Sequence, residues 1–256
     1  MNCPADIDRS LLIEGLGKGL RVIEAFSSGR ARLTATEVGQ LTSLTRTAAR
    51  RYLVSLVHFG FAESDGKHYW LLPSVTRLGQ TYLDSARLPR IARPLLKDLC
   101  ERISETCALS VLQRDEVYVL LQCNPPKRMA IGFPSGTRLS LRAASSGIAI
   151  ASALSQEDVS AWLGLRASCQ HETLAPEAVN EFVKAVDVAR SRGYGVADTG
   201  VNPGLVELAV PLRDRNARCL GALSATVQTC VYPNGSFTGS LLAELRRCAD
   251  LIGEVV

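Results

Sequence analysis

The stretch from Leu33 to Leu72 constrains the fold of this chain most, because several local signals follow one another there in a fixed order. A short helix is expected over Leu33–Leu41, followed by a tight turn at Thr42–Leu44. A longer helix is expected over Arg46–His58, with Thr45 at its N-cap. A helix, a turn of about three residues and a second helix are typical of a helix-turn-helix unit.

A β-hairpin is predicted directly after the longer helix. Gly60 ends that helix, and two strand-like runs, Phe61–Ser64 and Lys67–Leu71, then flank Asp65-Gly66. An Asp-Gly pair between two such runs is one of the strongest short hairpin signals. Helix, turn, helix and hairpin in this order predict a winged helix-turn-helix, a fold that reads DNA.

The longer helix separates into two faces when its residues are placed at about 100° per residue. Its apolar face carries Ala49, Tyr52, Leu53, Leu56 and Val57. Its other face carries Arg46, Thr47, Arg50, Arg51 and Val54. The apolar face can bury against the domain while the basic face meets phosphates and base edges. The alternative is an ordinary amphipathic helix whose arginines are only solvated.

The charge distribution favours DNA binding over that alternative. Between Leu16 and His58 the chain has seven basic residues (Lys18, Arg21, Arg30, Arg32, Arg46, Arg50, Arg51) against two acidic ones (Glu24, Glu37), a local balance of +5. A positive field at this segment suits a phosphate-binding surface. We expect Arg46, Thr47 and Arg50 to read base edges, Thr45 to start the reading helix, and Arg51, Lys18, Lys67 and His68 to contact phosphates.

Further helices are predicted on both sides of this unit. A first helix over Ile13–Ser27 would complete the helical core, with Leu16, Leu20, Ile23 and Phe26 as its buried stripe. A linker helix over Ser74–Ser85 would couple two domains more stiffly than a Gly/Ser linker.

Beyond Pro89 helices and strands are interspersed, which predicts an α+β domain with a mainly antiparallel sheet. Helices are expected over Ile91–Glu105, Ser145–Leu154, Pro176–Arg192 and Phe237–Val256, and another opened by Ser155-x-x-Asp158. Strands are expected over Cys107–Gln113, Val117–Gln122, Met129–Phe133, Tyr194–Asp198, Val206–Arg213 and Cys219–Val227.

Several strings resemble the isocitrate lyase regulator (IclR) family of bacterial transcription factors. They are Gly15–Phe26, Leu44–Arg51, Glu63–Gly66, Leu71–Gly79, Gly136–Leu139, Ala144–Gly147, Arg192–Tyr194, Pro203–Leu205 and Leu208–Pro211. The string Thr-Arg-Thr-Ala-Ala-Arg-Arg and the Leu-Leu-Pro string are most similar to the PcaR, PcaU and PobR branch, which controls aromatic-acid catabolism.

The resemblance implies a winged helix-turn-helix joined to a GAF-like effector domain, acting as a homodimer or homotetramer on a palindromic operator. The corresponding domains are residues 10–72 for DNA binding, 73–88 as a linker helix, and 89–256 for effector binding and oligomerisation. The chain departs from that branch at Ile148, at Asp198-Thr199-Gly200 and at Val206-Glu207. The regulator role carries over despite these departures, but the identity of the effector does not.

Carried over residue by residue, the resemblance implies an effector site for a small organic acid. Its lining would include Ser145, Ser146, Asp198, Glu207, Ser224 and Thr226. Backbone N–H groups at the start of the Ser145 helix would seat a carboxylate. Met129 and Ile131 could form an apolar wall, and Arg142 could bind the acid bidentately. Alternatively, Arg142 is a surface residue, and Glu207 forms a salt bridge to an arginine at the edge of the core.

Other function classes have weaker support in the sequence. There is no G-x-S-x-G string, metal-ligand spacing or phosphate loop, so we expect neither an enzyme nor a cofactor. A hydrolase with a serine nucleophile in Ala143–Gly147 is a remote alternative, because none of the three histidines lies beside it as a base. The eight cysteines are scattered, and we expect free thiols, with a redox sensor built from two of them as the alternative. No signal peptide or apolar run of about 18 residues is present, so we expect a cytoplasmic protein without a membrane partner.

Overall fold

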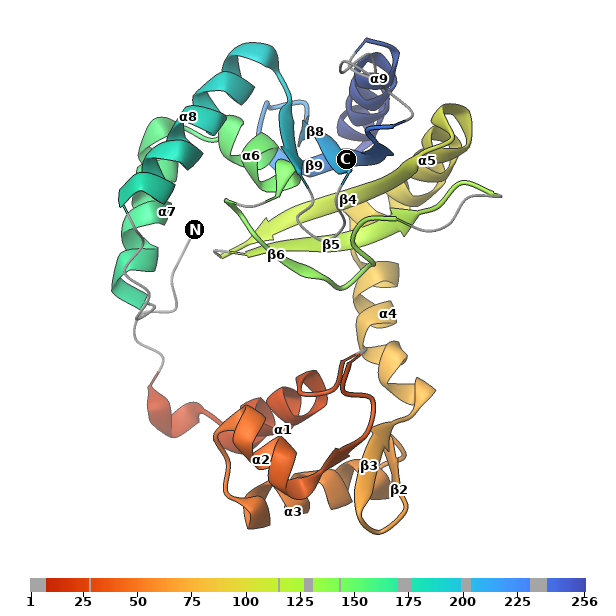
Figure 1. Cartoon of the computed structure of the whole chain (residues 1–256), viewed down its shortest axis with the longest axis vertical. Helices are drawn as coiled ribbons and strands as arrows, with labels where there is room; N and C mark the ends of the chain where they lie inside the picture. The colour runs from red at the N-terminus through yellow and green to blue at the C-terminus, as the bar shows by residue number, and fades with distance from the viewer. Residues whose placement is uncertain are drawn as a thin grey trace. The chain divides into compact units, whose positions relative to one another are not determined.

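The computed structural model describes residues 8–27, 29–114, 116–126, 131–142, 144–169, 176–198, 204–230 and 239–256. The chain divides into two compact units, Met1–Tyr82 and Leu83–Val256 (Figure 1). Each unit has its own hydrophobic core, so each is described separately.

The first unit is a winged helix-turn-helix. Its elements are η1 (Arg9–Leu11), α1 (Glu14–Glu24), β1 (Leu33–Thr34), α2 (Ala35–Thr42), α3 (Arg46–His58), β2 (Ala62–Ser64), β3 (His68–Leu71) and η2 (Pro73–Val75). The three strands form an antiparallel sheet in the order β1-β3-β2. Helix α4 (Thr76–Ser85) follows, in the segment that the sequence predicts to be helical.

The helix predicted over Leu33–Leu41 begins two residues later than expected. Leu33 and Thr34 form strand β1 instead, which pairs with Tyr69 and His68 of β3. The Thr34 hydroxyl accepts from the backbone N–H of Glu37, and the Glu37 carboxylate accepts from the backbone N–H of Thr34. This capping box starts α2 at Ala35, and the Thr-x-x-Glu string already contains its signal.

Helix α1 packs through a different face from the one predicted. The sequence stripe included Leu16 and Leu20, but their side chains are 65% and 48% exposed, so that assignment was wrong. The inward face carries the buried Val22 together with glycines. A Cβ at Gly19 would lie 3.7 Å from the ring of Tyr52 in α3. Because glycine leaves room there, α1 contacts α3 through its small residues and leaves its leucines outside.

The second unit is an α+β domain. Its helices are α5 (Arg87–Ile103), α6 (Ser145–Ser152), α7 (Gln156–Cys169), α8 (Pro176–Arg192) and α9 (Ser240–Val255). Its strands are β4 (Thr106–Gln113), β5 (Glu116–Cys123), β6 (Arg138–Ser140), β7 (Gly195–Asp198), β8 (Leu205–Arg213) and β9 (Cys219–Gln228). They form one antiparallel sheet in the order β6-β5-β4-β9-β8-β7.

Each face of this sheet is covered by helices (Figure 1). On one face Leu208 and Val210 of β8 join α5 and α9 in the larger core. On the other face Ala209 joins α6, α7 and α8 in a second core. The alternation along β8 therefore separates the two layers, as strand periodicity predicts.

Two predicted elements differ from the structure. The third strand was expected over Met129–Phe133, but Ile131–Phe133 is not in a strand, and the edge strand β6 forms at Arg138–Ser140 instead. Gly132 has a φ of +84°, which lies outside the strand region and explains the break. Helix α5 begins at Arg87, before the predicted start at Ile91. Pro89 lies in its first turn, where a missing N–H costs no helical hydrogen bond.

Candidate DNA-binding surface and effector site

The turn between α2 and α3 is held in a tight conformation. Ser43 adopts a left-handed conformation with a φ of 56°. A Cβ at Gly39 would lie 2.8 Å from the carbonyl oxygen of Leu44, so only glycine permits this approach. The Thr45 hydroxyl accepts from the backbone N–H of Ala48 at 3.2 Å, which confirms Thr45 as the N-cap of α3.

Helix α3 presents its basic face to solvent. Ala49 and Leu53 are fully buried, whereas the side chains of Arg46, Thr47, Arg50 and Arg51 are exposed. Val57, predicted on the apolar face, is at its margin and is 36% exposed. Among the residues that the structure describes, none of these three arginines forms an ion pair or a side-chain hydrogen bond. Their guanidinium groups are therefore available for an anionic partner.

The two predicted phosphate-contacting lysines differ in their surroundings. Lys18 of α1 forms an ion pair with Glu14 one turn earlier, with 3.1 Å between Nζ and Oε2. Lys67 lies at the tip of the wing and is exposed. Lys18 would have to leave a solvent-exposed ion pair to meet a phosphate, and such pairs cost little to break.

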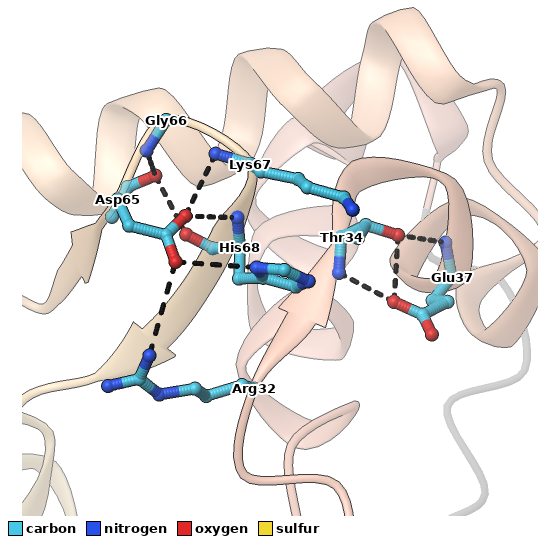
Figure 2. Close-up of polar contacts among 8 residues, drawn as sticks. Arg32, Thr34, Glu37, Asp65, Gly66, Lys67 and His68 are labelled. Carbon is cyan, nitrogen blue, oxygen red and sulfur yellow. Dashed lines mark hydrogen bonds and ion pairs between the residues drawn. The ribbon is translucent and has the colours of Figure 1, made fainter.

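The wing turn is organised by Asp65 (Figure 2). Its Oδ1 accepts from the backbone N–H groups of Lys67 and His68, at 2.9 and 2.7 Å. Its Oδ2 lies 3.3 Å from Nδ1 of His68 and 4.0 Å from Nη1 of Arg32 (Figure 2). The Arg32 guanidinium also lies over the ring of Trp70, 4.3 Å from its centroid. One carboxylate thus orders the loop that carries Lys67 and His68.

We expect Asp65→Ala to weaken DNA binding equally for all sequences and to reduce its salt dependence. The variant would loosen the turn that presents Lys67, and a lost phosphate contact lowers the slope of log affinity against log salt by about one. The test is a salt titration of binding, with Asp65→Asn as the control because it keeps an acceptor oxygen. An unchanged slope in Asp65→Ala would contradict a phosphate role for the wing.

The same carboxylate sets a pH dependence. The backbone N–H groups of His68 and Lys67 lower the pKa of Asp65 to about 2. Because this value is below the ordinary value of about 3.9, the turn is fully stabilised above about pH 4 and loses this stabilisation as the pH falls toward 2. NMR amide shifts of Lys67 and His68 should therefore titrate with an apparent pKa near 2.

In the second unit, the carboxyl group of the predicted effector residue Glu207 lies at the start of α6. The Ser145 hydroxyl donates to its Oε2 at 2.6 Å, and the Ser224 hydroxyl and the backbone N–H groups of Ser145 and Ser146 are further hydrogen-bond donors beside the carboxyl group. Glu207 is 4% exposed, and burial raises its pKa, opposed by these hydrogen bonds. The salt bridge to an arginine, given above as the alternative for Glu207, is absent among the described residues. The N–H groups expected to seat an effector carboxylate already bind this one.

A row of buried polar side chains lies on the same face of the sheet as Glu207. Thr226 pairs with Glu207 across β8 and β9, and Ser224 is two residues along β9. Ser110 is on the matching face of β4, since Ala108 and Ser110 pair with Ser224 and Ala222. Among the described residues, the hydroxyls of Ser110 and Ser146 are buried without a hydrogen-bond partner, and the Ser224 hydroxyl is buried beside Glu207.

Sequence reasoning missed Ser110 and the neighbouring Gln122. Side chains alternate between the two faces of a strand, so the sequence already places Ser110 on the same face as Thr106 and Ala108, opposite Cys107 and Leu109. The Gln122 amide nitrogen donates to the carbonyl oxygen of Ile131 at 3.0 Å. This bond places the predicted wall residue Ile131 beside the sheet.

The remaining predicted effector residues are placed less centrally. Asp198 is exposed at the end of β7, and Met129 lies outside the described residues. Arg142 is half-buried, three residues before α6, and its Nε is buried without a hydrogen-bond partner in the described parts of the chain. It is therefore not a simple surface arginine. Thr226 is close to the 131–132 segment, because a Cβ at Gly132 would lie 2.7 Å from its hydroxyl oxygen.

The cysteines are scattered in the sequence, but four of them come together in the fold. Cys100, Cys107 and Cys248 belong to one buried core, and Cys123 packs against it. The Cys107 thiol donates to the carbonyl oxygen of Glu105 at 3.6 Å, and Cys107 neighbours Cys100 and is paired with Cys123 across β4 and β5. Burial raises the pKa of Cys123, and that of Cys248 to about 11, which favours the unreactive thiol form. No cluster able to hold a metal ion occurs among the described residues.

Comparison with known proteins gives matches along most of the chain. The family model for the IclR helix-turn-helix domain matches residues 15–66, and the model for the bacterial transcriptional regulator IclR C-terminal domain matches residues 80–254. The p-hydroxybenzoate hydroxylase transcriptional activator of Acinetobacter baylyi is 33% identical over 255 residues, which cover 95% of this chain and 92% of that protein. The Pca regulon regulatory protein of Pseudomonas putida is 30% identical, and the match covers 82% of this chain and 73% of that protein.

Solved structures share the same fold. A transcriptional regulator from Rhodococcus sp. RHA1 superposes with a TM-score of 0.78 at 28% identity and covers 94% of this chain and 97% of its own. An IclR homolog from Microbacterium hydrocarbonoxydans, solved in complex with 4-hydroxybenzoate, has a TM-score of 0.71 at 24% identity. The match covers 93% of this chain and 97% of that chain. Within the described residues, no helix has the length and apolarity needed to cross a membrane.

Proposed function

The chain belongs to the IclR family of bacterial transcriptional regulators, and on that premise we propose that an aromatic acid bound in its second unit modulates its binding to a palindromic operator. We assign DNA binding to residues 10–72 and effector binding and oligomerisation to residues 89–256. Residues 73–88 form the helical linker that joins these two parts. The observation that carries this proposal is the free basic face of α3, displayed on a winged helix-turn-helix.

On the DNA side, α3 enters the major groove. Arg46, Thr47 and Arg50 lie on its exposed face near its N-terminal end and read base edges there, while Arg51 contacts the backbone. Lys18, Lys67 and His68 add phosphate contacts from α1 and the wing. A guanidinium can donate two parallel hydrogen bonds to guanine, which gives sequence specificity that a solvated arginine lacks.

On the effector side, the buried polar row supports a small polar ligand, and the relatives support its class. Two of the similar regulators are named for p-hydroxybenzoate hydroxylase and for the Pca regulon. Arg142, whose buried Nε has no hydrogen-bond partner among the described residues, would bind the ligand's carboxylate, and Ser110, Ser146 and Ser224 would line the polar side. Binding there shifts the population of arrangements that present α3 to DNA.

Helix α1 supports self-association of the DNA-binding unit. Leu16 and Leu20 of α1 and the residues Leu12 and Ile13 just before it form an exposed apolar stripe, with side chains that are 65%, 48%, 49% and 77% exposed. Contiguous apolar surface of this kind on a folded domain typically marks an interface. We assign the stripe to a second copy of the same chain, because a palindromic operator requires two reading helices related by a two-fold axis.

We expect Leu16→Glu combined with Leu20→Glu to shift the protein toward monomer and to weaken operator binding. Two charges in the middle of an apolar interface would have to be desolvated without partners. The measurement is the mass by sedimentation equilibrium alongside an operator gel shift. The matched control is Val188→Glu, because Val188 is similarly exposed, at 45%, but lies on α8 of the second unit. An unchanged mass in the double variant would remove α1 from the interface.

The proposed function as a whole is tested by two assays on the full chain. A gel shift with the DNA upstream of its own gene tests operator binding. Calorimetry with a panel of aromatic and short-chain acids tests the effector class. Binding of DNA without heat from any acid would overturn the effector part and leave the DNA-binding part standing.

The thiol cluster favours a second candidate, a regulator that senses oxidation. Peroxide would join the neighbouring Cys100 and Cys107 in a disulfide, two thiols and one peroxide giving the disulfide and two waters. Both residues are nearly fully buried, 1% and 0% exposed, which opposes access of the oxidant. A gel shift with and without peroxide decides between the candidates.

A further inference from the structure

An apolar side chain lies in the middle of the basic face of α3. Val54 is 47% exposed, whereas Ala49 and Leu53 on the inward face of the same helix are fully buried. At about 100° per residue, the direction of Val54 lies about 40° from that of Arg50 on one side and about 60° from that of Arg51 on the other. Both arginines are exposed. A partner that meets this face therefore meets the two methyl groups of Val54 between two guanidinium groups.

Helix propensity does not explain a valine at this exposed position. Residues branched at Cβ form helices less readily than alanine, lysine or glutamine, and the exposed methyl groups gain nothing from water. The same branching leaves valine with one strongly preferred χ1 rotamer in a helix. The methyl groups of Val54 are therefore held in one direction, which suits contact with a partner that presents apolar surface at a fixed place.

One base presents apolar surface of this kind in the major groove of DNA. Thymine carries its 5-methyl group there, whereas the other three bases present hydrogen-bonding groups without a methyl group. Val54 follows Arg50 by one helical turn, which is a rise of about 6 Å along α3. Successive base pairs are about 3.4 Å apart. A thymine that meets Val54 would therefore lie within about two base pairs of the base pair that Arg50 reads.

We propose that Val54 is a specificity-determining residue that contacts the methyl group of one thymine in each half of the operator. This inference rests on the proposed DNA-binding role of α3 and names a base that the operator must contain. It adds an apolar contact to the hydrogen bonds assigned to Arg46, Thr47 and Arg50. The contact removes the methyl groups of both partners from water, so the loss of either partner weakens binding.

The test replaces thymine by uracil, which lacks the 5-methyl group and keeps every hydrogen-bonding group of the base. The probe is a duplex that the full chain selects from a pool of random DNA sequences. Each thymine of this duplex is replaced in turn, and the affinity is measured by fluorescence anisotropy. We expect one replacement in each half of the site to weaken binding about threefold to tenfold, the effect of one lost methyl contact.

The Val54→Ala variant provides the second arm. It should bind the thymine and uracil duplexes equally, because the shorter side chain no longer reaches the methyl group. Val188→Ala is the matched control and should keep the wild-type ratio, since Val188 is 45% exposed but lies on α8 of the second unit. A wild-type chain that is insensitive to every replacement, or a sensitivity that persists in Val54→Ala, would overturn the inference and leave DNA binding intact. If the pool yields no selected sequence, the proposed operator binding is overturned as well.

Discussion

Replacing Arg50 by alanine is expected to cost about 1–3 kcal/mol of operator binding and to relax specificity at one base pair. Arg50 lies on the exposed face of α3, one turn after Arg46, and has no partner of its own among the described residues. Its loss therefore removes DNA contacts without breaking contacts inside the protein. The measurement is a binding isotherm on the operator and on single-base variants of it.

Arg50→Lys is the informative control for that experiment. Lysine keeps the charge, so a purely electrostatic role predicts near-wild-type binding. A base-reading role predicts that Arg50→Lys also loses specificity, because an ammonium cannot donate two parallel hydrogen bonds to guanine. If the Arg50→Ala variant binds every DNA sequence as tightly as the wild type does, Arg50 is only solvated and does not contact base edges.

Gly147→Ala is expected to destabilise the second unit by about 1–3 kcal/mol or more and to abolish effector binding. A Cβ at this position would overlap the carbonyl oxygen of Leu141. The atoms of Leu141 that it would meet belong to the backbone, so they cannot shift without moving the chain. Helix α6 would have to shift away, and with it the N–H groups that hold Glu207. Urea unfolding, followed by calorimetry on the folded variant, measures both effects.

The matched control is Gly79→Ala in α4, where a Cβ would meet nothing within 4 Å. Alanine is favoured over glycine inside a helix by about 1 kcal/mol, so this variant should be as stable as the wild type or more stable. Equal stability of the Gly147→Ala and Gly79→Ala variants would contradict the close packing of α6 on Leu141.

The elements were largely predictable because their signals are local. Thr45 caps α3, Asp65-Gly66 turns the wing, and α8 spans Pro176–Arg192 as predicted. The errors arose where a tertiary contact outweighs a local pattern. The sequence pattern predicts Leu16 to be buried, but the glycines of α1 face Tyr52 and Leu16 is exposed. The pattern also predicts Leu33 to be helical, but Leu33 pairs with Tyr69 in a sheet.

The sequence by itself determined the two-part architecture, helix α3 and its basic face, because periodicity, capping and charge act between residues close in the chain. Only the tertiary structure decided what surrounds Glu207 and the cysteines. Ser145 and Glu207 are 62 residues apart, and Cys248 joins Cys100 across most of the second unit. Such contacts depend on strand order and helix placement, which no local pattern encodes, and for that reason the surroundings of Glu207 emerged only from the fold.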